Sequence, residues 1–117
     1  MTDQSVRELF EKYKRVGIKK GHELLMAPFV AISFIDALSQ KNIKIVGCDT
    51  WRYTKIDNWV GIIENVGGGM EVDGYKDLNT QQIAEIMKRF IVSISSNDVD
   101  LISLLFDDQE MYSLLIN

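Results

Sequence analysis

Three stretches of the chain carry apolar residues at helical spacing. The first follows Ser5 and Glu8, which have the spacing of a capping box, and it stops before Gly17, where a glycine typically ends a helix. The only proline, Pro28, suits the first turn of a second helix, PFVAISFIDALSQ. Apolar residues cover most of the circumference of that segment, which predicts burial on more than one side.

A third helix is predicted where Asn79 and Gln82 are suited to cap its start. Its apolar stripe is the clearest in the chain: Ile83, Ile86, Met87, Phe90, Ile91 and Ile94. We expect the segment SSND to end this helix. Between the first two helices, GIKKGHELLMA is predicted to be a connector with two glycines.

The remaining apolar segments favour β-structure. Residues 43–53 and 59–66 are predicted strands, with TKIDN as the turn between them, and the glycines at 67–69 and 74 predict a mobile or tightly bent loop. The ending, DLISLLFDDQEMYSLLIN, is predicted to be a β-hairpin that turns at residues 107–110. The order α-α-β-β-α-β-β indicates an α+β fold. We expect one domain over residues 1–117, with about three helices packed on a mostly antiparallel sheet.

Composition narrows the class of protein. The chain has 117 residues, 46% of them hydrophobic, and no apolar run approaches the 18 residues that a membrane span needs. Its polar N-terminus does not resemble a secretory signal, and its single cysteine excludes an internal disulfide framework. We therefore expect a cytoplasmic protein.

The net charge of −4 is unevenly distributed along the chain. Residues 1–55 carry ten Lys or Arg against six acids, whereas residues 56–117 carry three against eleven. Such a field repels phosphate backbones and attracts basic partners. We therefore expect a basic protein as the partner, and no nucleic acid.

The sequence contains little that is suited to catalysis. His22 is the only histidine, so any nucleophilic mechanism with Cys48 must use it. We expect Cys48 to be a small buried hydrophobe and His22 a surface or capping residue. No spaced set of metal ligands occurs, and GGGM lacks the ending and the context of a phosphate-binding loop. We expect no enzyme activity, no metal and no cofactor.

The segment GCDTWRY, residues 47–53, is the richest in chemistry, and two strand registers are open for it. A straight strand places Asp49 among core residues, which is costly unless the carboxylate is paired. A bulge at Gly47 instead turns Asp49, Trp51 and Tyr53 to an accessible face, with Cys48 and Thr50 inward. Alternatively, both tryptophans pack under the helices.

Acids and aromatics near this segment form a candidate protein-binding surface, because aromatic residues are frequent interface anchors and acids steer cationic partners. The acids at the predicted hairpin tip are alternatively solvated turn residues. The candidate partner-binding residues are Asp49, Trp51, Tyr53, Asp57, Trp59, Glu64, Glu71, Asp73, Asp107 and Asp108.

In size, acidic balance and element order, and in the run from GIKKGHELL through AISFIDAL to IKIVGCDTWRY, the chain resembles the small immunity proteins of bacterial polymorphic-toxin and contact-dependent growth inhibition systems. The resemblance implies a cytoplasmic antitoxin that binds a cognate toxin domain, often a nuclease with a basic surface, and neutralises it by occlusion. It carries over no catalytic or cofactor residue. The alternatives are a regulatory or adaptor module that binds another basic protein, and a small hydrolase or transferase that uses Cys48 or His22.

Overall fold

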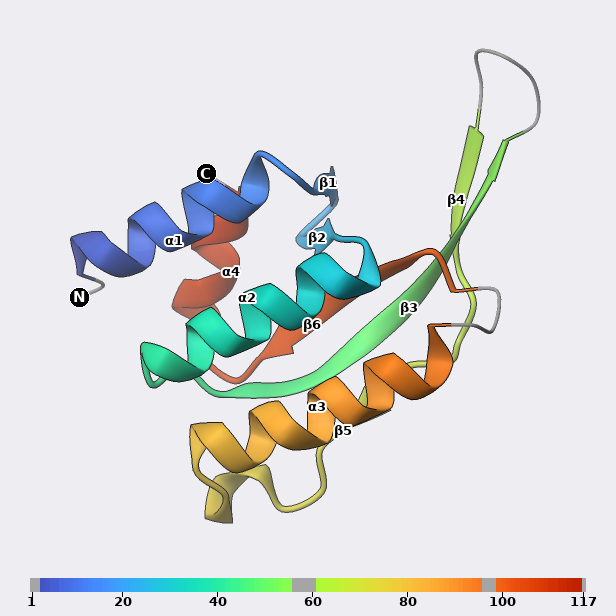
Figure 1. The fold of residues 1–117 in the computed structure, drawn as a ribbon. Helices are drawn as coiled ribbons and strands as arrows, with labels where there is room; N and C mark the ends of the chain where they lie inside the picture. The colour runs from blue at the N-terminus through green and yellow to red at the C-terminus, as the bar shows by residue number, and fades with distance from the viewer. Residues whose placement is uncertain (1–2, 56–60, 96–98, 117) are drawn as a thin grey trace.

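Strand β3 (Ile45–Lys55) lies at the centre of an α+β fold (Figure 1). The computed structural model describes residues 3–55, 61–95 and 99–116. Strand β6 (Leu101–Phe106) pairs with one side of β3, and β4 (Gly61–Asn65) and β5 (Met70–Glu71) pair with the other, all of them antiparallel. This arrangement confirms the α+β class and the antiparallel sheet.

The helices α2 (Pro28–Gln40) and α3 (Thr80–Ile94) lie side by side over one face of this sheet (Figure 1). The side chains that they bury join those of the sheet in one core cluster, which includes Phe34, Ile91, Cys48 and Leu104. Helix α1 (Gln4–Lys14) packs against α4 (Gln109–Ile116), and a short 3-10 helix, η1 (Tyr75–Asp77), precedes α3.

Local signals at the helix ends explain most of these boundaries. Helix α2 spans PFVAISFIDALSQ with Pro28 in its first turn, as predicted. Asn79 and Gln82 form a complete capping box at the start of α3. The prediction was wrong for α1, because Asp3 rather than Ser5 accepts the backbone N–H of Val6 and caps the helix. Within the described residues, no helix has both the length and the apolar character needed to cross a membrane.

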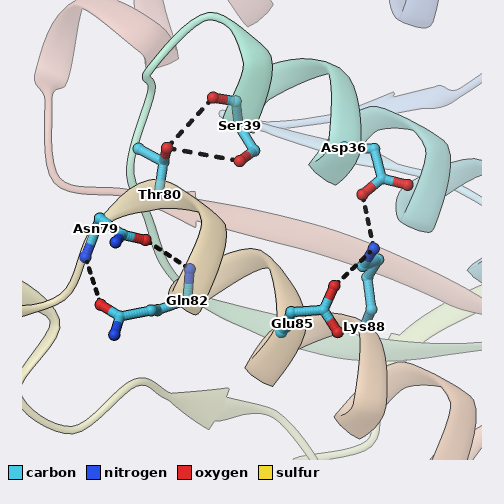
Figure 2. A network of polar contacts seen from close by, with 7 residues as sticks. All are labelled: Asp36, Ser39, Asn79, Thr80, Gln82, Glu85 and Lys88. Atoms are coloured by element: carbon cyan, nitrogen blue, oxygen red, sulfur yellow. Dashed lines mark hydrogen bonds and ion pairs between the residues drawn. The ribbon is translucent and has the colours of Figure 1, made fainter.

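Polar side chains also fasten α2 to α3 along their solvent edge (Figure 2). Lys88 Nζ lies 2.8 Å from Asp36 Oδ1 of the other helix and 3.2 Å from Glu85 Oε1 of its own. Thr80 donates its hydroxyl hydrogen to the carbonyl oxygen of Ser39 at 3.2 Å. These contacts join the two helices outside the hydrophobic core.

Two segments differ from the sequence prediction. The expected connector forms a small antiparallel hairpin, β1 (Ile18–Lys20) and β2 (Glu23–Leu25), with Gly21 at a positive φ of 61° in its turn. The expected C-terminal hairpin is a strand followed by the helix α4. Asp108 accepts the backbone N–H of Glu110, and Met111 and Leu115, four residues apart, are buried. The apolar residues of so short a segment fit both the helical spacing and the alternation of a strand. The sequence pattern alone therefore did not distinguish the two.

Candidate protein-binding face

A bulge in β3 decides which side chains of GCDTWRY face the core. Ile45 pairs with Phe106 and Gly47 with Leu105, so that Val46 is an extra residue in β3. Beyond the bulge Cys48 and Thr50 are buried, 1% and 0% exposed, and Cys48 belongs to the core cluster. The bulged register that the sequence left open is therefore the one adopted.

Alternation places Asp49, Trp51 and Tyr53 on the opposite face of β3, turned away from α2 and α3. Glu71 joins them, because it pairs with Gly47 and lines the same hollow as Asp49. Glu23 of β2 reaches this face and hydrogen-bonds there. We call this surface the acid–aromatic face; it consists of Glu23, Asp49, Trp51, Tyr53 and Glu71.

Trp51 supports this face from within, and the expectation that it would be accessible was wrong. Its side chain is only 7% exposed, although it does not belong to the core cluster. The indole N–H donates to Ser103 Oγ at 2.9 Å, and Ser103 itself is fully buried. A buried indole N–H needs a hydrogen-bond acceptor, and Ser103 of the neighbouring strand β6 supplies it.

Tyr53, by contrast, is accessible, with 47% of its surface exposed. Its ring lies over Gly61 of β4, where a Cβ atom would overlap the ring. Its backbone N–H donates to Asp100 Oδ2 at 2.8 Å, which fixes the backbone beneath the ring. Tyr53 is therefore a positioned, exposed aromatic of the kind that serves as an interface anchor.

Glycines 67–69 shape the surface next to Asp49. These glycines lie in the loop between β4 and β5, where the backbone N–H of Gly68 donates to Thr50 Oγ1 at 3.0 Å. A Cβ atom at Gly69 would overlap the carbonyl oxygen of Cys48, so only glycine permits this close approach. The resulting hollow of about 250 Å³ is bordered by Asp49, Glu71 and Leu105. The prediction of a tightly bent loop is confirmed.

Glu23 is joined to the sheet by a serine of β6. Glu23 Oε1 accepts the Ser103 hydroxyl at 3.0 Å. Burial raises the pKa of Glu23, and the neighbouring Asp49 raises it further. Sequence analysis missed Glu23, because 80 residues separate it from Ser103 and no local pattern reports such a contact.

A second group of acids is exposed at the start of η1 and at the β6–α4 turn. Tyr75 donates its hydroxyl hydrogen to Asp107 Oδ1 at 2.9 Å, which brings the two segments together, and this bond raises the pKa of Tyr75. Asp73 and Asp108, next to them in sequence, are exposed as well. Lys44 donates to the carbonyl oxygen of Tyr75 at 3.3 Å and ties this end to β3.

The other predicted interface residues do not join the acid–aromatic face. Glu64 is exposed but pairs across β4 and β3 with Arg52, so it belongs to the opposite face of the hairpin. Asp57 and Trp59 lie outside the described residues. The structure therefore separates Glu64 from Asp49 and Tyr53, which the sequence had grouped together.

Nucleophilic chemistry gains no support from the geometry. Burial raises the pKa of the Cys48 thiol to about 11, so the thiol stays protonated at neutral pH. His22 is exposed and borders a different hollow, with Gln109, Tyr112 and Ser113. Across residues 3–55, 61–95 and 99–116, no group of three His, Cys, Asp or Glu side chains is placed to hold a metal ion.

No protein-family model, no curated protein and no solved structure gave a significant match.

Proposed function

We propose that this chain is an immunity protein, which binds a cognate bacterial toxin domain through the acid–aromatic face and occludes the toxin's active site. One observation carries the proposal. An exposed aromatic, Tyr53, shares a sheet face with the carboxylates of Asp49 and Glu71, and α2 and α3 lie on the other face. Aromatic anchors flanked by acids suit a basic protein surface.

A nuclease toxin supplies such a surface, because its active site must be cationic enough to hold phosphates. An inhibitor that covers this site gains from carboxylates in two ways. Long-range attraction speeds association, and contacts between a carboxylate and Arg or Lys form charge-assisted hydrogen bonds. The excess of acids in residues 56–117 adds to the attraction.

Co-expression with the product of the adjacent gene, followed by pull-down, tests the proposal. We expect a one-to-one complex that forms more slowly as salt rises, because screening weakens the steering attraction. Charge neutralisation by Glu71→Gln should slow association several-fold. Glu64→Gln is the matched control, because it makes the same charge change on the opposite face of the hairpin. Failure to recover a stable complex would overturn the proposal.

A further inference from the structure

The open face of the sheet continues beyond the acid–aromatic face onto the β1–β2 hairpin. In this hairpin Ile18 pairs with Leu25, and Lys20 pairs with Glu23. Directly paired residues point to the same face of a sheet, so Ile18 and Lys20 lie on the side to which Glu23 turns. Leu24, the residue between Glu23 and Leu25, belongs instead to the core cluster on the helix side. Ile18 therefore shares the sheet face of the acid–aromatic residues.

The hairpin is joined to β6 at two points. Met26 and Ile102 exchange two backbone hydrogen bonds of 2.8 and 2.7 Å, directly after β2. The Ser103 hydroxyl donates to Glu23 Oε1 at 3.0 Å within β2 itself. The hairpin thus extends the sheet past β6 and has a fixed place beside it.

Ile18 is an exposed aliphatic side chain on this face. Its surface is 45% exposed, close to the 47% of Tyr53. The helices bury their apolar side chains in the core cluster, which lies on the other face of the sheet (Figure 1). The open face therefore has an exposed aromatic on β3 and an exposed aliphatic residue at its β1 edge.

The separation of these two side chains suits a single protein interface. The strands follow one another across the face in the order β3, β6, β2 and β1. Neighbouring strands lie about 4.8 Å apart, so β3 and β1 are about 14 Å apart. A typical interface covers about 800 Å² of each partner, which is a patch roughly 30 Å across. One partner can therefore contact Tyr53 and Ile18 together.

The charges on this face favour a basic partner over a second copy of the chain. Glu23, Asp49 and Glu71 supply carboxyl groups, and Lys20 adds an ammonium group at the β1 edge. Two copies stacked face to face would bring the carboxylates of both together, which opposes self-association. A basic protein brings the opposite charge to the same groups.

We propose that Ile18 is a second apolar anchor for the basic partner, so that the binding surface extends from Tyr53 across the open face to the β1–β2 hairpin. The inference rests on the proposed function and adds to it. The toxin domain then carries an apolar contact for Ile18 within its basic surface. Apolar contacts enclosed by a polar rim are the usual arrangement of a protein interface.

Affinity for the purified product of the adjacent gene tests the inference. Ile18→Ala should weaken the complex at least about fivefold, as expected for an interface residue that contributes to binding. Val92→Ala, which trims an exposed aliphatic residue of α3, is the matched control and should leave the affinity unchanged. A complex that Tyr53→Ala weakens but Ile18→Ala does not would overturn the inference and leave the proposed function standing. Absence of any complex with wild type would overturn both.

Two charged substitutions at the same position test the sign of the partner's charge there. Ile18→Lys and Ile18→Glu both remove the aliphatic side chain and differ in charge. Ile18→Lys should associate more slowly than Ile18→Glu at low salt, and the difference should shrink as salt rises. Equal association rates of the two variants would contradict a basic partner at this edge.

Chemical labelling of wild type tests the same surface without any variant. Complex formation should protect the exposed amine of Lys20 from an amine-reactive reagent, whereas Lys12, exposed on α1, should stay reactive. Equal labelling of Lys20 in the free and the bound chain would overturn the inference. Self-association of the free chain that Ile18→Ala abolishes would do the same, because a second copy would then occupy the face.

Discussion

The ring of Tyr53 lies over Gly61 of the neighbouring strand, in space that a Cβ atom at position 61 would occupy. Gly61→Ala should therefore displace the ring and shift its aromatic proton signals, with little loss of secondary structure. Glu64→Ala, on the same strand but on the other face, is the control. Unchanged Tyr53 ring signals in Gly61→Ala would contradict the described packing.

Ser103 hydrogen-bonds to two side chains at once, the buried indole of Trp51 and the half-buried carboxyl group of Glu23, so removal of its hydroxyl should be destabilising. Ser103→Ala leaves the Trp51 indole N–H without its acceptor and Glu23 without a donor. We expect a loss of about 1–3 kcal/mol in the free energy of unfolding. Ser113→Ala, at an exposed helical serine, should change it by less than about 0.5 kcal/mol. Equal effects of the two substitutions in urea unfolding would argue against the buried network.

The start of α3 depends on its capping box (Figure 2). Asn79→Ala removes the acceptor for the Gln82 backbone N–H, and we expect a cost of about 1 kcal/mol in the free energy of unfolding. Gln81→Ala, at an exposed position in the same turn, is the control. A Gln81→Ala variant that is destabilised as much as Asn79→Ala would show that the cap contributes nothing specific.

The contact between Tyr75 and Asp107 predicts that the phenol of Tyr75 ionises at a higher pH than an ordinary tyrosine. The carboxylate accepts the phenol hydrogen and opposes a second negative charge, which raises the pKa of Tyr75. Asp107→Asn should lower that pKa in a titration of tyrosinate absorbance, because it removes the charge. Asp108→Asn, one residue further along, should have the smaller effect. The reverse order would refute the described contact.

Most of the framework could be predicted from local signals. Pro28 and the capping residues Asn79 and Gln82 mark the starts of α2 and α3, because caps and first turns depend on residues close in sequence. The bulge near Gly47 was one of two registers open, and the cost of burying Asp49 was the physical reason to consider it.

What the sequence did not reveal depends on contacts between distant residues or on short segments. The role of Glu23 appears only when β2 is placed beside β6, and the burial of Trp51 depends on Ser103 of another strand. Helix α4 was predicted to be a strand, because its few apolar residues fit both helical spacing and strand alternation. The local sequence pattern could not show that Glu64 and Glu71 lie on opposite faces of the sheet, because the pairing of each strand with β3 decides this.

The affinity of the purified adjacent-gene product for wild type and for Tyr53→Ala tests the central claim most directly. If the acid–aromatic face is the binding surface, wild type forms a tight one-to-one complex. Tyr53→Ala then weakens the complex at least about 30-fold, the loss of a hot-spot residue worth about 2 kcal/mol. A complex that Tyr53→Ala leaves unchanged, or no complex with wild type, would contradict the claim.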